Sequence, residues 1–147
     1  MKITLQQIKE GKEEVIVKYK QMTEHIQGIV RYVEGQSEKL FGSKDGQECM
    51  LPIHDIIYLE SVDGITYIYT EEGVYKGNLT LVLAEVMYAE EGFVRCSKSM
   101  VINMYHIQKL KSMSGNRIDV TMDNGEHVIV SRRYAKEIRR ILKEEGR

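Results

Sequence analysis

Basic and hydroxyl side chains occupy the ends of two short apolar stretches in the C-terminal part of the chain. The first stretch is FVRCSKSMVIN, residues 93–103, and the second is VSRRY, residues 130–134. Their basic and hydroxyl members are Arg95, Ser97, Lys98, Ser99, Ser131, Arg132 and Arg133. Such groups, projecting from loops at strand ends, can bind phosphates and reach the base edges of nucleic acid. The same pattern fits the solvated rim of a small β domain, so the residues alone leave both interpretations open.

The charges of the chain are divided unequally between its two parts. The whole chain of 147 residues has a formal net charge of −1, which by itself argues against a nucleic-acid partner. Residues 1–94, however, contain 9 Lys and Arg against 16 Asp and Glu, whereas residues 95–147 contain 12 against 6. The two parts therefore have net charges of −7 and +6. This asymmetry favours a C-terminal surface that faces a polyanion.

The sequence contains no pattern typical of an enzyme, a metal site or a bound cofactor. Cys49, Cys96 and four scattered histidines have neither metal-ligand nor redox spacing, and there is no phosphate-binding glycine loop or nucleophile elbow. The chain also has no signal peptide and no apolar run near about 18 residues, which predicts a cytoplasmic protein that does not insert into a membrane. We expect no catalytic residue, no metal and no cofactor.

Short strands separated by glycine-containing turns are predicted for most of the chain after residue 40. Asp-Gly dipeptides predict tight hairpins at residues 45–46 and 63–64. Helical spacing of apolar residues predicts helices at 79–87 and at 132–143, with Asn78 as the cap of the first. This order of elements predicts a mainly β fold of antiparallel sheets with accessory helices.

The first fifty residues are expected to form a small α/β extension. Alternating apolar residues predict strands at 2–6 and 14–20. A helix with Thr23 as its N-cap and Gly35 as its stop follows, and its apolar stripe consists of Met22, Ile26, Ile29, Val30 and Val33. Because such a stripe must be buried, we expect it to pack against the hairpin at residues 40–53. The polar face of the helix would then remain available for dimerisation or a regulatory partner.

Four segments of the chain together resemble the LytTR DNA-binding domain of bacterial response regulators. In order, they are IIYLESVDG, YKGNL, GFVRCSKSMVIN and HVIVSRRY. The resemblance covers roughly residues 53–143 and implies a stack of small antiparallel sheets whose loops enter successive major grooves of double-stranded DNA, without a helix-turn-helix. Only about fifty residues precede it, and they lack the pattern of a receiver domain. The chain is therefore similar to stand-alone LytTR regulators, which are often encoded beside a small membrane protein.

The resemblance also implies a role for each polar residue of the two stretches. Arg133 matches the arginine that reads a base, a role that suits a planar guanidinium facing guanine O6 and N7. Lys98 falls where the family contacts the backbone or a base, and we expect it to bind phosphate with Ser97. Thr66, in the turn at residues 63–66, belongs to a third contact region. Supporting roles fall to Arg95, Ser99, Asn103, Ser131 and Arg132. The alternatives are a structural ion pair for Arg95 and hydrogen bonds within a turn for Asn103.

The predicted organisation is an extension at residues 1–50, which replaces the receiver as the regulatory or dimerisation element, and a LytTR-like domain at residues 51–147. The predicted function is that of a transcriptional regulator, homodimeric at least on DNA, that binds repeated half-sites sequence-specifically. One alternative is a β-rich protein-interaction module that uses its basic C-terminal face. Another is non-specific binding of single strands, which is disfavoured because the basic C-terminal third has few aromatic residues.

Overall fold

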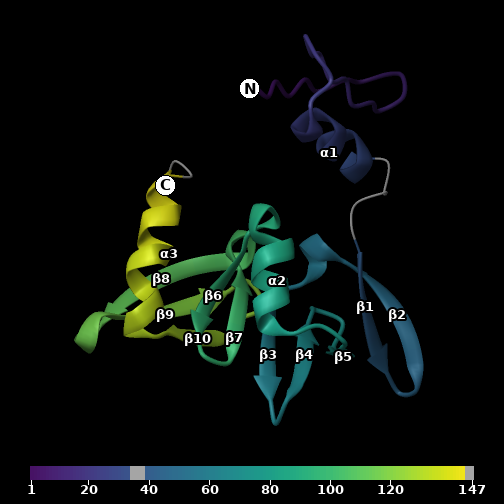
Figure 1. Ribbon diagram of the computed structural model, residues 1–147. Helices are drawn as coiled ribbons and strands as arrows, with labels where there is room; N and C mark the ends of the chain where they lie inside the picture. The colour runs from purple at the N-terminus through teal and green to yellow at the C-terminus, as the bar shows by residue number, and fades with distance from the viewer. Residues whose placement is uncertain (34–38, 145–147) are drawn as a thin grey trace. The chain divides into compact units, whose positions relative to one another are not determined.

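The computed structural model describes residues 1–33 and 39–144 of the chain (Figure 1). The chain divides into two compact units, residues 1–37 and residues 38–147. The second unit thus begins earlier than residue 51, where the sequence analysis placed the start of the DNA-binding domain. The difference arises because the hairpin of residues 39–52, which spans this position, joins the sheet of the second unit.

The first unit contains the helix α1 (Glu24–Val33). The Thr23 hydroxyl accepts a hydrogen bond from the Ile26 amide at 3.2 Å, which confirms Thr23 as the N-cap. Along the predicted apolar stripe, Ile26 is buried, whereas Met22 and Val33 are each about half exposed. The helix is therefore amphipathic as predicted, with part of its apolar stripe accessible.

The strands predicted at residues 2–6 and 14–20 are wrong, because residues 1–23 contain no strand. Apolar residues do alternate in these segments, but Val15 remains exposed. A strand becomes stable when neighbouring strands pair with it and one of its faces is buried, and neither condition is met here. The described part of the extension is therefore a helix preceded by irregular backbone rather than an α/β unit. Gly35, the predicted stop of the helix, lies outside the described residues.

The second unit contains a large antiparallel sheet. Its seven strands, in spatial order, are β2 (Gln47–Pro52), β1 (Lys39–Lys44), β5 (Val74–Gly77), β4 (Ile65–Tyr69), β3 (Tyr58–Val62), β7 (Met100–Asn103) and β6 (Phe93–Ser97). Each strand runs antiparallel to its neighbours. The chain turns from β3 to β4 and from β6 to β7 at the same end of the sheet, because β3 and β7 are antiparallel neighbours (Figure 1).

A second, three-stranded antiparallel sheet follows in the chain. Its order is β10 (His127–Val130), β9 (Arg117–Met122) and β8 (Ile107–Met113). The helix α3 (Arg132–Glu144) begins directly after β10 and packs against β6 and β9 (Figure 1). Short 3-10 turns connect other elements: Ile53–Asp55, Ala89–Glu91, Met104–His106 and Ser114–Asn116. Two antiparallel sheets with accessory helices confirm the predicted mainly β fold of the DNA-binding domain.

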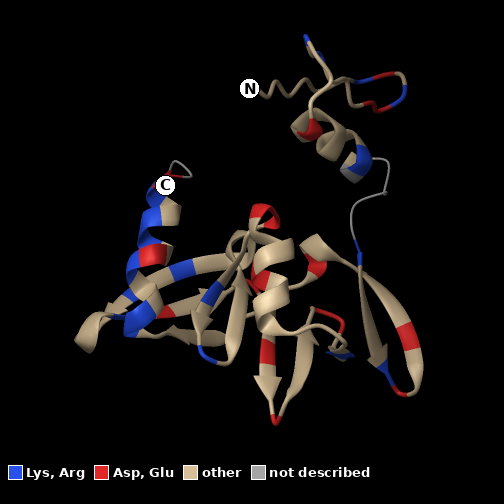
Figure 2. Cartoon of the chain, in the orientation of Figure 1, with Lys and Arg blue, Asp and Glu red and all other residues tan. Residues whose placement is uncertain are grey.

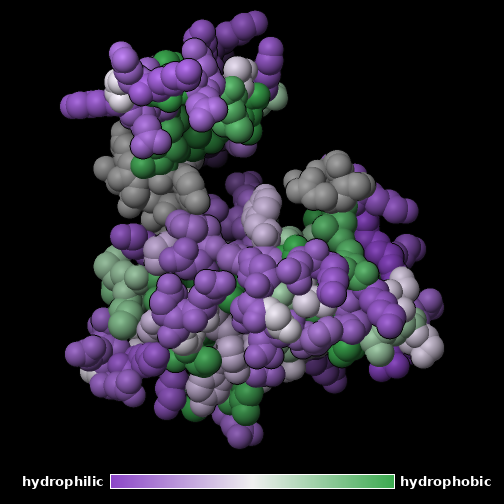
Figure 3. Space-filling model, turned by 180° about the vertical axis from the view of Figure 1, so that it is seen from behind, coloured by the Kyte–Doolittle hydropathy of each residue, from purple (hydrophilic) through white to green (hydrophobic). Residues whose placement is uncertain are grey.

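The large sheet buries both of its faces around β3 and β7. Leu59 and Val101 belong to a core that includes residues of the helix α2 (Leu81–Met87). Their chain neighbours Tyr58 and Ile102 belong to a second core, which includes residues of the small sheet and of α3. This alternation follows from the period of two along a strand, which sends successive side chains to opposite faces. Viewed from behind, the second unit presents a largely hydrophilic surface (Figure 3).

The local turn signals are mostly confirmed. Residues 45–46 connect β1 to β2 and residues 63–64 connect β3 to β4, and all four have φ between 51° and 79°, as a hairpin turn of this type requires. The cap of α2 is different, however. Thr80 rather than Asn78 is its N-cap, because the Thr80 hydroxyl accepts a hydrogen bond from the Leu83 amide at 3.1 Å.

Candidate nucleic-acid interface

The loop between β6 and β7 is held by a hydrogen bond within the loop and by one from β3. The Ser99 amide donates to the Ser97 hydroxyl at 3.2 Å, and the amide of Ser61 in β3 donates to the Ser99 carbonyl at 2.8 Å. A register shift between Arg95 and Ser97 places a β-bulge just before the loop. Lys98 lies at the loop and is exposed. The loop thus presents a lysine from a fixed backbone.

The junction between β10 and α3 lies beside this loop. The Ser131 amide donates a hydrogen bond to the Cys96 carbonyl at 2.9 Å, which joins the two polar stretches of the sequence. The Ser131 carbonyl then accepts hydrogen bonds from the amides of Tyr134 and Ala135, both at 3.0 Å, and so begins α3. The structure therefore brings together the exposed or half-buried residues Ser97, Lys98, Ser99, Ser131, Arg132 and Arg133.

Arg133 is exposed at the start of α3. Its guanidinium carbon lies 5.4 Å from the centre of the Tyr134 ring, within the range of a cation–π contact. Such a contact at an exposed site is weak, about 0.5–1 kcal/mol, so it does not prevent the side chain from turning to another partner. The position fits the role that the sequence predicted for Arg133, and its contact with DNA stays a prediction.

Arg95 is engaged within the protein, which favours the structural alternative for this residue. Its Nη1 donates to Glu85 Oε2 at 2.7 Å, its Nε to the Ser97 carbonyl at 2.8 Å and its Nη2 to the Lys98 carbonyl at 2.5 Å. The Arg95 side chain is 17% exposed. Glu85, on α2, was not among the predicted site residues, because nothing in the sequence links positions 85 and 95.

Asn103 and Thr66 are both buried, which disfavours the DNA contacts expected of them. Asn103 is 1% exposed, and its amide group donates to the Ile56 carbonyl at 2.9 Å and accepts from the Tyr105 amide at 3.1 Å. The alternative of a turn-stabilising asparagine is thereby confirmed. Thr66 is 6% exposed within β4. At the nearby turn, exposed Asp63 adds a negative charge that disfavours a phosphate.

A basic surface continues from the junction along α3 (Figure 2). A shallow hollow of about 590 Å³ lies on it, and its lining contains no acidic residue. It is lined by Asn116, Arg132, Ala135, Lys136, Arg139, Arg140 and Lys143. Of these residues, only Arg132 was included in the site predicted from the sequence. Arg140 is occupied by ion pairs with Glu137 and Glu144, which raise its pKa. Exposed Lys136 and Lys143 extend the basic surface beyond the predicted residues.

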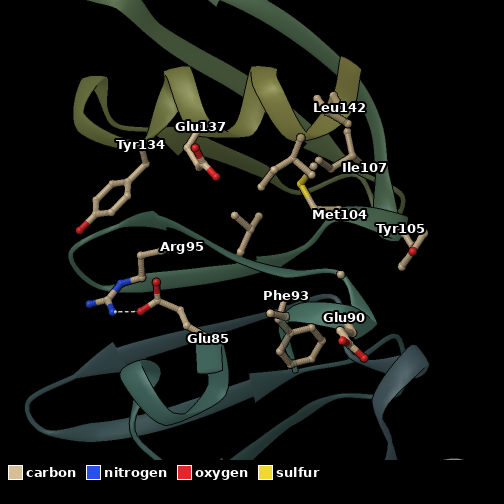
Figure 4. A pocket seen from close by; sticks show the side chains of 14 residues that line it. Glu85, Glu90, Phe93, Arg95, Met104, Tyr105, Ile107, Tyr134, Glu137 and Leu142 are labelled. Atoms are coloured by element: carbon tan, nitrogen blue, oxygen red, sulfur yellow. Dashed lines mark hydrogen bonds and ion pairs between the residues drawn. The ribbon is translucent and has the colours of Figure 1, made fainter. Parts of the chain in front are cut away.

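A groove of about 540 Å³ separates α2 from α3 over β6 (Figure 4). Glu85, Arg95 and Tyr134 lie at one end, and Tyr105 and Leu142 lie at the other. The floor between them is partly apolar. This groove borders the Arg95–Glu85 ion pair, so the loop before β7 and the helix α2 are connected at its edge.

The described residues contain no cluster that could hold a metal ion, and one of the two thiols is buried. No group of three or more His, Cys, Asp and Glu in this part of the chain could hold a metal ion. Burial raises the pKa of the Cys96 thiol to about 12, so the thiol remains protonated and unreactive at neutral pH. Cys49 is half-buried and is not disulfide-bonded. Within residues 1–33 and 39–144, no helix has the length and apolar character needed to cross a bilayer.

Comparison with known proteins places the fold in one family. Residues 46–143 match the family described as the LytTr DNA-binding domain. A solved LytTr DNA-binding domain from Bacillus cereus superposes with a TM-score of 0.68 and 28% sequence identity, covering 72% of this chain and 97% of that domain. These matches confirm the resemblance that the sequence suggested, and they confirm a non-enzymatic DNA-binding family.

The similar bacterial proteins are of two lengths. The sensory transduction protein LytT of Bacillus anthracis is 29% identical over 140 residues, which is 95% of this chain and 54% of LytT. The chain thus spans about half the length of that relative. An uncharacterized HTH-type transcriptional regulator of Staphylococcus aureus (strain MSSA476) is 26% identical over 136 residues, 91% of this chain and 92% of that protein. Since the family match covers most of the chain, the chain belongs to the LytTR family of DNA-binding domains.

Proposed function

We propose that this protein is a transcriptional regulator that binds double-stranded DNA sequence-specifically through the β6–β7 loop and the β10–α3 junction. The observation that carries the proposal is the hydrogen bond from the Ser131 amide to the Cys96 carbonyl. It fixes two loops with exposed basic residues, Lys98 on one and Arg132 and Arg133 on the other, as one surface. Basic groups on a rigid backbone can position a protein on phosphates while one of them reads a base.

One basic loop supplies sequence specificity and the other supplies affinity for phosphate. Arg133 reads a guanine in the major groove, where its planar guanidinium can donate two hydrogen bonds to O6 and N7. Lys98 binds phosphate, with the hydroxyl groups of Ser97 and Ser99 as supporting donors. The exposed lysines of α3 add further phosphate contacts. Thr66 and the acidic β3–β4 turn contribute no contact, so the surface on one copy of the chain is small.

A small surface suggests that two copies bind together on repeated half-sites in successive major grooves. A single recognition module buries roughly 600–1,000 Å² of protein surface, which gives limited specificity by itself. Half-sites about one helical turn apart would place two copies on the same side of the duplex. The residues before β1, with the partly exposed stripe of α1, are the proposed element for self-association or for a regulatory partner. The regulator would act in the bacterial cytoplasm, where its DNA lies.

Selection from a library of random DNA duplexes tests this function with the full chain. We expect enrichment of a short repeated motif that contains at least one guanine, and binding that weakens steeply with salt. A single strand of the selected sequence should bind far less tightly than the duplex. Binding to duplexes without any enriched motif would contradict sequence-specific recognition. Absence of duplex binding, together with capture of an acidic protein by the basic surface, would instead favour a protein-interaction module.

A further inference from the structure

Arg95 connects the helix α2 to the loop that carries Lys98. Its guanidinium donates to a carboxylate oxygen of Glu85 and to two successive loop carbonyls, those of Ser97 and Lys98. Figure 4 shows the guanidinium facing Glu85 at the edge of the groove. A planar group with donors in a fixed fork can hold several acceptors in one geometry, which a flexible lysine cannot do. We refer to Glu85, Arg95 and the two carbonyls as the α2 clamp.

The α2 clamp determines which groups of the loop face outward. Together with the Ser61 amide, which donates to the Ser99 carbonyl at 2.8 Å, Arg95 occupies the carbonyls of three successive residues. Carbonyl oxygens carry partial negative charge and would repel a phosphate. Because they bond to donors within the protein, the loop leaves the Lys98 ammonium available to an anion.

Glu85 holds the Arg95 guanidinium in this position. Its side chain is 33% exposed, and its contact with Arg95 Nη1 at 2.7 Å is a charge-assisted hydrogen bond. Without the carboxylate, the guanidinium would keep only neutral acceptors and could turn toward solvent or toward a phosphate. The loop carbonyls would then lose their shared donor, and the backbone that presents Lys98 would lose its fixed geometry.

We infer that Glu85 is a positioning residue for DNA recognition, which acts through Arg95 on the β6–β7 loop; this rests on the function proposed above. The expected change in DNA affinity on removal of Glu85 is opposite to the one that charge alone predicts. Removal of a negative charge near a polyanion should strengthen DNA binding if only long-range electrostatics operate. If Glu85 positions the loop, its removal weakens specific binding although the protein becomes more positive.

Glu90 provides a matched control for the change in charge. It lies in the 3-10 turn after α2 and lines the same groove, it is exposed, and it is not part of the α2 clamp (Figure 4). The full chain would be compared with its Glu85→Ala and Glu90→Ala variants on a selected duplex and on a random duplex. We expect Glu85→Ala to bind the selected duplex about three- to tenfold more weakly, as loss of a hydrogen bond to a charged group at a partly exposed position implies. Glu90→Ala should bind as tightly as the unmodified chain or slightly more tightly.

Two further measurements separate positioning from general damage to the fold. In the Arg95→Gln background, Glu85→Ala should cause no additional loss of affinity, because the α2 clamp is already broken. Without DNA, the amide NMR signals of Ser97, Lys98 and Ser99 should shift in Glu85→Ala and stay in place in Glu90→Ala. If Glu85→Ala and Glu90→Ala bind the selected duplex equally well, or if the loop amides do not shift, the inference is wrong while the proposed function stands. If the unmodified chain selects no duplex, both fail together.

Discussion

Replacement of Asn103 by alanine should reduce the stability of the fold rather than remove a DNA contact. The Asn103 side chain bridges two backbone groups, the Ile56 carbonyl at 2.9 Å and the Tyr105 amide at 3.1 Å. Ile56 is fully buried, so its carbonyl would lose a partner that water cannot easily replace. A buried polar group left without a partner costs about 1–3 kcal/mol. The Tyr105 side chain is exposed, so we assign the lower end of this range to its amide.

The two losses together predict a decrease of about 2–4 kcal/mol in the free energy of unfolding. This is a large share of the roughly 5–15 kcal/mol that stabilises a typical domain. Urea unfolding, followed by circular dichroism, measures the difference between Asn103→Ala and the unmodified chain. The salt dependence of DNA binding by the folded variant should be unchanged, because no phosphate contact is lost.

Ser99→Ala is the matched control for this prediction. It removes a polar group from an exposed position in the same hairpin, and it leaves the hydrogen bond from the Ser99 amide to the Ser97 hydroxyl in place. Its free energy of unfolding should change by no more than about 0.5 kcal/mol. An Asn103→Ala variant that unfolds like the unmodified chain but binds DNA more weakly would refute the structural role of Asn103.

Three other predictions concern the thiol, the spacing of half-sites and the first unit. Folding raises the pKa of Cys96 from 9.0 to about 12, so the unfolded chain ionises first and stability should fall as the pH rises from about 9 toward 12. Between pH 8 and pH 10, the free energy of unfolding measured in urea should fall by about 1 kcal/mol less in Cys96→Ala than in the unmodified chain. An equal fall in both would contradict this assignment. Insertion of about five base pairs between selected half-sites should reduce joint occupancy in gel-shift titrations. Binding of a single half-site as tight as that of the repeat would contradict this expectation. A shortened chain that begins at Lys39 should fold and bind one half-site but lose self-association or joint occupancy, measured by light scattering and titration; unchanged behaviour would exclude a role for the first unit.

The elements that could be predicted from the sequence are those with local causes. Asp-Gly dipeptides predicted both hairpin turns because positive φ at adjacent residues is a local requirement. The helix α3 was predicted almost to its ends from the spacing of its apolar residues. The family resemblance supplied the rest of the fold, since residues 46–143 carry the segments by which it is identified.

The features that sequence reasoning missed depend on contacts between distant residues. Thr66 looks like a turn residue, yet its pairing with Ser61 and Gly77 on neighbouring strands buries it. The apolar alternation near Val15 resembles a strand, but this segment pairs with no strand among the described residues. The contact between Glu85 and Arg95 joins a helix to a strand, and either residue alone looks like an ordinary surface charge. Such pairings are decided by tertiary structure.

The effect of Arg133→Ala on selected and random duplexes measures most directly whether this surface reads DNA sequence. Arg133 is exposed and makes a weak contact with the Tyr134 ring, so the variant should fold normally. Binding to the selected duplex should weaken by about 1–3 kcal/mol, and the preference for guanine at one position should relax. Lys98→Ala should weaken binding to both duplexes alike and lower the salt slope by about one. Equal losses on the selected and the random duplex in Arg133→Ala would contradict base reading by Arg133.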